Sequence, residues 1–337
     1  MGGGIAGSRL AIPVTESGGI GLIGATNSMS ELTRELDKCH QHFSKHHKYA
    51  SLPTLPIGVG FLLFLVRMED VIKTLRMAAK PPVLIWLFAA QEPDSTSLYT
   101  DWTRRLRTEL PHTQIWIQVG GSVNIAMKIA RSAKPDVLVV QGNDAGGHGS
   151  EVGASLLALV PETVLELAQA GIDIPVIAAG GVAEARTAAA ALALGAAGVV
   201  MGTRFLTANE ITLPHPEYQR RIINATDGAA STVRAKVFDE LRGKNTWPVT
   251  YDGRALVNNS YQDWRRGVSP EEIVQRMGRE LSRGQQGDLG YGVESDRAAI
   301  WAGTTVGLVD RVMPAADIVC EVRQGIRDVL RETLSRL

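Results

Sequence analysis

The feature that most constrains the fold is a series of short apolar runs, which alternate with longer stretches of helical periodicity. The runs cover residues 19–24, 55–64, 82–89, 114–120, 136–142, 174–181 and 198–205. The stretches between them cover residues 29–47, 68–79, 96–110, 123–133, 154–170 and 183–194. A strand that is buried on both faces is apolar throughout, which is typical of parallel sheets covered by helices. Strands that alternate with single helices predict right-handed crossovers and an α/β fold.

Seven strands are one fewer than a closed (β/α)8 barrel, the TIM barrel, requires. The chain opens with MGGGIAG and a helix-type stretch at residues 8–17, so no strand precedes that helix. Either the sheet is open or the sequence lacks its natural first strand. We favour the second interpretation because the other βα units are regular. The sequence therefore predicts a TIM barrel whose first strand is truncated.

The pattern changes after Phe205. Residues 209–300 are richer in charged residues, Asn, Gln and Gly, and contain the helix-type segments HPEYQRRI, AKVFDELRG and PEEIVQRMGRELSRG. Apolar helical periodicity returns from Ala315 onward. We expect three parts, which are a barrel at 1–208, a mostly helical insertion at 209–300 and a closing segment with a C-terminal helix at 301–337.

Composition excludes several classes of protein. The formal net charge is zero, so the chain lacks the basic field that typically marks nucleic-acid binding. The longest apolar run, PPVLIWLFAA, is too short to span a bilayer. Cys39 and Cys320 lie far apart without metal-like spacing, which fits free thiols in a reducing compartment. We therefore expect a cytoplasmic protein without nucleic-acid or membrane partners.

The stretch QGNDAGGHGS, from Gln141 to Ser150, places His148 in a glycine-rich loop at the end of an apolar run. In a (β/α)8 barrel the site lies at the C-terminal ends of the strands, and phosphates often bind after strands 7 and 8. If the missing strand is the first, these strands end at Gly180–Gly181 and Gly202–Thr203. Glycines allow backbone N–H groups to approach an anion, so the pattern predicts a phosphate-bearing ligand.

Three motifs, QGNDAGGHG, IPVIAAGGV and GVVMGTRF in this order, resemble those of the nitronate monooxygenases, formerly called 2-nitropropane dioxygenases. The opening segment MGGGIAGSRLAIPVTESGGIGLIG and the segment WAGTTVGLVDRVMPAADIV are similar to the first βα unit and the closing segment of that family. The resemblance covers about residues 1–208 and 300–320. It implies an FMN-dependent barrel that oxidises alkyl nitronates with molecular oxygen.

The resemblance also implies roles for individual residues. His148 matches the catalytic base, which takes the proton from the carbon beside a nitro group and orients the nitronate. The residues that match FMN contacts are Gln141 and Gly146 beside the ring, Gly180 and Gly181 in the turn after strand 7, and Met201, Gly202 and Thr203 in the strand-8 phosphate loop. Asp144 departs from the Glu of many relatives. Relatives also contact the flavin near the end of a first strand that is here reduced to Met1, so we expect weaker FMN binding and lower stability than in an extended chain.

Two other functions stay open at this point. One is an FMN-dependent reductase of the same barrel type, which passes electrons from NAD(P)H to a quinone or an enoyl thioester. The other is a flavin-free protein without enzymatic activity, in which the truncation of the first strand has abolished cofactor binding.

Other conspicuous residues receive simpler interpretations. Residues 40–48 hold four histidines, and His42 and His46 are spaced i,i+4. Nothing in the sequence except Cys39 completes a ligand set, so we expect a solvated helix end and no metal. Tyr291 and Trp301 flank the end of the insertion and are candidates to cover the substrate.

Overall fold

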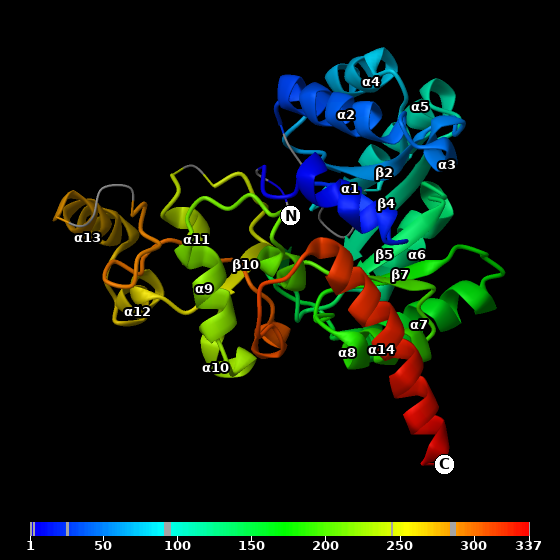
Figure 1. Ribbon diagram of the computed structural model, residues 1–337. Coiled ribbons are helices and arrows are strands. Elements are labelled where there is room, and N and C mark those ends of the chain that lie inside the picture. The colour runs from blue at the N-terminus through cyan, green and yellow to red at the C-terminus, as the bar shows by residue number, and fades with distance from the viewer. Residues whose placement is uncertain are drawn as a thin grey trace.

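The structure is a computed structural model that describes residues 2, 4–24, 27–90, 96–243, 245–283 and 288–336. Figure 1 shows a large sheet with its helices, beside which the chain segment after residue 208 forms a second body of helices and strands. Met1, the expected remnant of a first strand, lies outside the described residues.

The main sheet is parallel throughout, and its strands follow the order β1-β2-β3-β4-β5-β7-β8. These strands are β1 (Gly21–Ile23), β2 (Leu55–Leu62), β3 (Pro82–Phe88), β4 (Gln114–Gly120), β5 (Val137–Gln141), β7 (Val176–Ala179) and β8 (Gly198–Val200). Each apolar run contains one strand, which confirms the TIM-barrel-like α/β fold. The run at 198–205 is a strand only at its start, because the 3-10 helix η1 (Thr203–Thr207) follows.

Helices connect successive strands and cover the outer face of the sheet. They are α1 (Ser8–Glu16), α2 (Met29–Phe43), the short α3 (His47–Ala50), α4 (Met68–Met77), α5 (Ser97–Glu109), α6 (Val123–Ser132), α7 (Leu156–Gln169) and α8 (Ala185–Ala193). Ile85 on β3 packs with Trp102 of α5 in the core between sheet and helices. Its neighbour Leu84 points to the other face, where it packs with Trp116 and Val139. Both faces of β3 are therefore buried, which explains its continuous apolar sequence.

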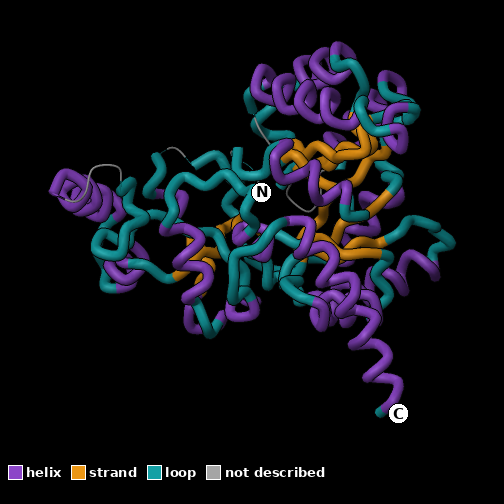
Figure 2. Tube along the Cα trace, viewed as in Figure 1, coloured by secondary structure: helices purple, strands orange, loops and turns teal. Residues whose placement is uncertain are grey.

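A second sheet adds two strands to the segment that the sequence predicts to be a mostly helical insertion. β9 (Thr232–Ala235) and β10 (Tyr251–Leu256) lie within residues 209–300. β10 pairs antiparallel with both β9 and β6 (Gly147–Ser150), which gives the order β6-β10-β9. Figure 2 shows this sheet apart from the main one. The helices of the segment are α9 (Glu217–Asn224), α10 (Gly228–Ser231), α11 (Val237–Glu240), α12 (Asn259–Arg265) and α13 (Pro270–Arg283). β10 is buried along nearly its whole length. Its apolar residues therefore belong to the packing of this second sheet. The division at residues 208 and 300 stays a prediction.

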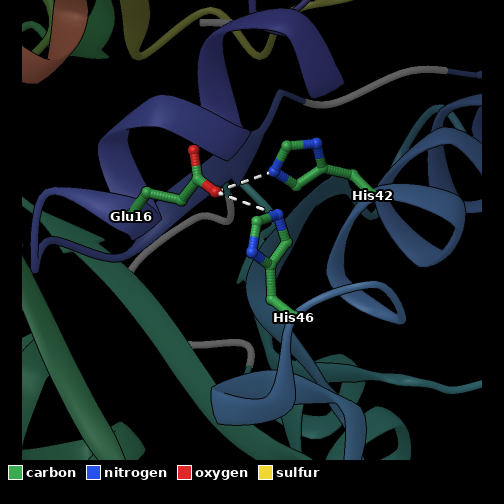
Figure 3. Close-up of side chains that lie close together, drawn as sticks. All are labelled: Glu16, His42 and His46. Atoms are coloured by element: carbon green, nitrogen blue, oxygen red, sulfur yellow. Dashed lines mark hydrogen bonds and ion pairs between the residues drawn. The ribbon is translucent and has the colours of Figure 1, made fainter.

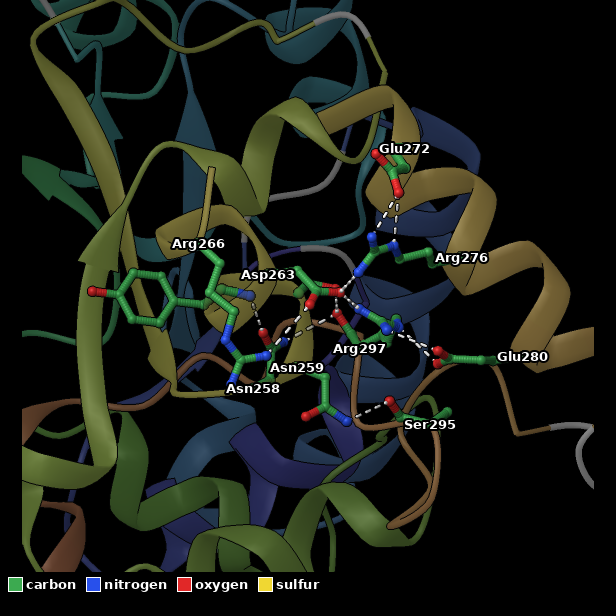
Figure 4. A network of polar contacts seen from close by, with 11 residues as sticks. Asn258, Asn259, Asp263, Arg266, Glu272, Arg276, Glu280, Ser295 and Arg297 are labelled. Atoms are coloured by element: carbon green, nitrogen blue, oxygen red, sulfur yellow. Dashed lines mark hydrogen bonds and ion pairs between the residues drawn. The ribbon is translucent and has the colours of Figure 1, made fainter. Parts of the chain in front are cut away.

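A polar network fixes α12 and α13 to the chain near residue 297 (Figure 4). The guanidinium of Arg297 is buried and donates to Asp263 at 2.9 Å and to Glu280 at 2.7 Å. Asn258 donates to the carbonyl of Arg297 at 3.0 Å and also caps α12. A buried charge is tolerated when it is paired and hydrogen-bonded, so this network determines how the two helices pack.

The closing segment returns to the main sheet through η2 (Thr304–Leu308) and α14 (Ala315–Ser335). α14 packs against α8 and α1, and its C-terminal end extends away from the rest of the protein (Figure 1). Gly325 permits α14 to approach α8 closely, since a Cβ at this position would lie 2.5 Å from that of Ala185.

Candidate active site

His148 lies beyond the C-terminal end of β5. Gln141 ends that strand, and its side-chain amide donates to the backbone carbonyl of His148 at 3.1 Å. His148 itself belongs to β6, where it pairs with Gly253 of β10. The loop QGNDAGGH is therefore held at one end by the main sheet and at the other by the second sheet.

A row of polar side chains crosses the C-terminal ends of three neighbouring strands. The indole N–H of Trp86 on β3 donates to Gln118 on β4 at 2.9 Å. The amide of Gln118 in turn donates to Gln141 on β5 at 2.5 Å. All three side chains are half-buried. A continuous series of hydrogen bonds fixes one orientation for each amide, so these three side chains form a rigid polar surface beside His148.

The insertion and the start of the closing segment surround the imidazole of His148. Its Nε2 lies 2.8 and 2.9 Å from the two carboxylate oxygens of Asp239 on α11. The ring of Trp247 stacks on the imidazole, with centroids 3.8 Å apart and planes 5° apart, and Trp301 tilts against it at 5.0 Å. An ionised carboxylate only accepts hydrogen bonds, so Nε2 carries the hydrogen and Nδ1 is left for another partner.

Trp247 also reaches the C-terminal ends of strands in the main sheet. Its ring contacts Phe64 at 5.0 Å and Phe88 at 6.1 Å between centroids, and these two residues follow or end β2 and β3. Aromatic rings in edge-to-face or offset contact contribute beyond the area they bury. The insertion thus covers the strand ends through this tryptophan.

Sequence reasoning missed Gln118, Asp239 and Trp247. Gln118 lies inside an apolar run, and Asp239 and Trp247 belong to a segment without a recognisable motif. Trp301 lies against His148, and its expected role in covering the substrate stays a prediction. Tyr291 instead packs against His215 and Tyr218, in a different cluster.

The closing segment holds the loop from its other side. Thr304 donates from its backbone N–H to the carbonyl of Asp144 at 3.0 Å and from its hydroxyl to the Asp144 carboxylate at 2.8 Å. A Cβ on Gly146 would lie 2.5 Å from backbone atoms of residues 302 and 303. Gly146 therefore has a packing role, whatever else contacts it.

Comparison with known proteins now identifies the family. The family model described as nitronate monooxygenase matches residues 1–325. Nitronate monooxygenase npaC of Metarhizium robertsii is 39% identical over 335 residues, which cover 98% of this chain and 90% of that protein. The chain belongs to the nitronate monooxygenase family. A nitronate monooxygenase of Neurospora crassa is 34% identical and covers 97% of this chain, which spans 88% of that protein.

Among solved structures, FabK from Thermotoga maritima superimposes with a TM-score of 0.70 at 25% identity, covering 99% of this chain and 94% of its own. Membership of the nitronate monooxygenase family makes the chain an oxidoreductase, and the family is generally flavin-dependent. Within the described residues, no helix is both long and apolar enough to span a membrane.

The turns expected to bind phosphate in this family member lie side by side after β7 and β8. Gly180 and Gly181 have φ angles of +87° and +80°, which favour glycine. A Cβ on Gly180 would lie 2.8 Å from the Gly142 carbonyl, and one on Gly181 would lie 2.9 Å from the Cβ of Asp144. Both glycines thus pack against the loop that leads to His148.

The backbone around these turns fits an anionic group. Among the described residues, the N–H groups of Gly181 and Gly202 donate to no protein acceptor. A Cβ on Gly202 would meet nothing within 4 Å, so open space adjoins it. The Thr203 hydroxyl accepts from Gly303 at 3.0 Å and keeps its own hydrogen for a ligand. Met201 packs its side chain against Val182 and α8, so only its backbone faces the turn.

Two arginines of the second sheet add positive charge beside the loop. Arg234 pairs with Asp252 at 3.1 Å and donates to the Asn143 side chain at 3.2 Å. Arg254 donates to the Asn143 carbonyl at 3.3 Å, and its buried Nε has no hydrogen-bond partner among the described residues. Burial lowers the pKa of both guanidinium groups from a very high ordinary value, so both stay charged. The carboxylates of Asp252 and Asp144 lie close enough to offset part of this charge.

Proposed function

We propose that this chain is an FMN-dependent nitronate monooxygenase that oxidises alkyl nitronates with molecular oxygen. The observation that carries the proposal is the position of His148, fixed between Asp239 and Trp247 at the C-terminal ends of the parallel strands. Relatives named nitronate monooxygenase match along nearly the whole chain.

FMN would be held by residues from three adjacent strand ends. The backbone of Gly180, Gly181, Met201 and Gly202 and the hydroxyl of Thr203 would hold its phosphate, and Gln141 and the loop at Gly146 would adjoin its ring. Bound FMN would supply the electron chemistry, by accepting electrons from the substrate carbon and passing them to oxygen. The N–H groups of Gly181 and Gly202, which donate to no acceptor within the described part of the chain, support this placement.

The protein would contribute a positioned base. Asp239 holds Nε2–H of His148, so Nδ1 is available to take the proton from the carbon beside a nitro group. When the substrate arrives already as a nitronate, no proton has to be removed, and the protonated imidazole, in which both ring nitrogens are donors, would donate a hydrogen bond from Nδ1 to its oxygen. Trp247 and Trp301 flank the ring, whose side chain is 12% exposed, and would limit its contact with water.

We also propose that the enzyme acts in the cytoplasm on small molecules alone. The two cysteines are free, and Cys39 is buried, which supports a reducing compartment.

The test begins with a visible absorption spectrum of the purified protein, followed by anaerobic addition of an alkyl nitronate. We expect flavin bands that bleach on addition and return with air. His148→Ala should slow bleaching by a neutral nitroalkane about 100-fold or more, and slow bleaching by the preformed nitronate less, since only the nitroalkane needs a base. Flavin that ignores the nitronate and bleaches with NAD(P)H would contradict the proposal and indicate a reductase. A protein that stays colourless with added FMN would contradict the cofactor assignment.

A further inference from the structure

Three potential metal ligands meet on the surface of the N-terminal helices, away from the His148 site. Nε2 of His42 lies 2.8 Å from Oε1 of Glu16, and Nε2 of His46 lies 3.7 Å from the same oxygen. The two imidazole rings are 5.0 Å apart. Figure 3 shows both rings directed at the carboxylate from different parts of the chain.

The fold brings these ligands together from the ends of α1 and α2 and the start of α3. Glu16 is the last residue of α1, His42 lies in the last turn of α2, and His46 precedes α3. One ligand atom from each residue lies within 4.8 Å of those of the other two. The side chains are between 36% and 49% exposed, so an ion could enter from solvent.

The chemistry of this set favours one class of ion. Imidazole nitrogens with a carboxylate suit Zn²⁺ and neighbouring transition metals, whereas Mg²⁺ and Ca²⁺ require oxygen ligands. Ligand atoms about 2.0–2.1 Å from a tetrahedral zinc ion lie roughly 3.3 Å apart, between the two separations seen here. Small side-chain rotations would therefore suffice, and water would complete the coordination.

Cys39, the partner that the sequence offered, does not belong to the site. It is fully buried, and burial raises the pKa of its thiol to about 12. A metal ligand must be the thiolate, so Cys39 is excluded. Glu16 takes that place because α1 packs on α2, a contact that spacing along the chain does not reveal.

We propose that Glu16, His42 and His46 form a binding site for a divalent transition-metal ion of the zinc class, which ties α1 to α2. The consequence is structural and independent of flavin. α1 covers the edge strand β1, and its Thr15 hydroxyl accepts from Gly21 at 3.0 Å and donates to Pro56 at 3.1 Å. An ion that fixes the end of α1 should therefore stabilise this edge of the sheet.

The experiment titrates ZnCl₂ into the untagged full-length protein after chelator treatment, with calorimetry and thermal melting as readouts. We expect one zinc ion per chain. The thermal midpoint should rise by about 5 °C at a free zinc concentration 100-fold above Kd. Glu16→Gln, His42→Ala and His46→Ala should each weaken binding about 10-fold or more. His47→Ala, which removes an adjacent exposed histidine outside the cluster, should not.

Several results would overturn the proposal. They are no stoichiometric binding, an affinity that survives the double substitution of His42 and His46, equal loss in His47→Ala, or equal binding of Ca²⁺. Any of these results would indicate that the three residues form an ordinary surface ion pair and not a metal site. His46→Ala keeps the experiment interpretable if another variant unfolds, because His46 is exposed and contacts the carboxylate only at 3.7 Å.

Discussion

Substitution of Gly146 by alanine tests whether this residue serves packing or flavin binding. The added Cβ would lie 2.5 Å from the carbonyl carbon of Ala302 and the amide nitrogen of Gly303. Both are backbone atoms, so no flexible side chain can move away. The substitution should push the closing segment off the loop that precedes His148, without any cofactor being present.

The cost follows from the hydrogen bonds that this separation breaks. They run from Thr304 to Asp144 through backbone and side chain, and from Gly303 to the hydroxyl of Thr203. At about 1 kcal/mol each, their loss amounts to about 3 kcal/mol. For a chain of this size we expect a thermal midpoint about 6 °C lower, at about 2 °C per kcal/mol.

Gly147→Ala is the matched control. Gly147 has a φ angle of +71°, but a Cβ there would meet nothing within 4 Å. Its strain costs about 1–2 kcal/mol, or about 2–4 °C. Thermal melts of flavin-free protein should therefore rank Gly146→Ala as the more damaging substitution. A Gly146→Ala protein that melts like the wild type and yet loses FMN would refute the packing argument and favour the flavin contact.

Other substitutions test neighbouring features. Asp239→Asn should lower kcat/KM for a neutral nitroalkane about 10- to 100-fold with flavin content unchanged, because a charge-assisted hydrogen bond to the imidazole is lost; unchanged kinetics would argue against a positioning role. A thiol reagent should label Cys320 in the folded protein and Cys39 only after unfolding, as peptide mass spectrometry would show; early labelling of Cys39 would contradict its burial. Burial raises the pKa of Asp263, but the hydrogen bond and charge of Arg297 outweigh it and hold that pKa below its ordinary value. The stabilisation is therefore present at neutral pH and lost as the pH falls through that lowered pKa. Asp263→Asn should lower the free energy of unfolding at about pH 7 by about 2 kcal/mol, which thermal melting would show as a midpoint about 4 °C lower, and by less in acid. An equal loss at every pH would contradict this.

The main sheet could be predicted from the sequence because its strands are buried on both faces. The run at 82–89 became β3 (Pro82–Phe88) almost residue for residue, since nothing but apolar side chains fits between helices and barrel interior. Strand ends were less well defined. The run at 198–205 turned into η1 after Val200, where contacts with the closing segment decide the backbone.

The rest of the site depends on contacts between distant parts of the chain. GHGS carries no β-type residues, and it forms β6 only because β10 lies beside it, about 100 residues later. Asp239 and Trp247 reach His148 through the same arrangement, so no local pattern marks them. Local propensity gives way to tertiary context at such positions.

The shared antiparallel sheet has a consequence for engineering. β6 takes its ladder partners from β10, so removal of residues 209–300 would strip the strand that carries His148 of its backbone partners. A chimera that grafts the insertion of one relative onto the barrel of another must therefore preserve the register of Gly253 opposite His148. A slip by one residue would turn the imidazole to the opposite face of its strand, so the two parts can be exchanged only as a matched pair.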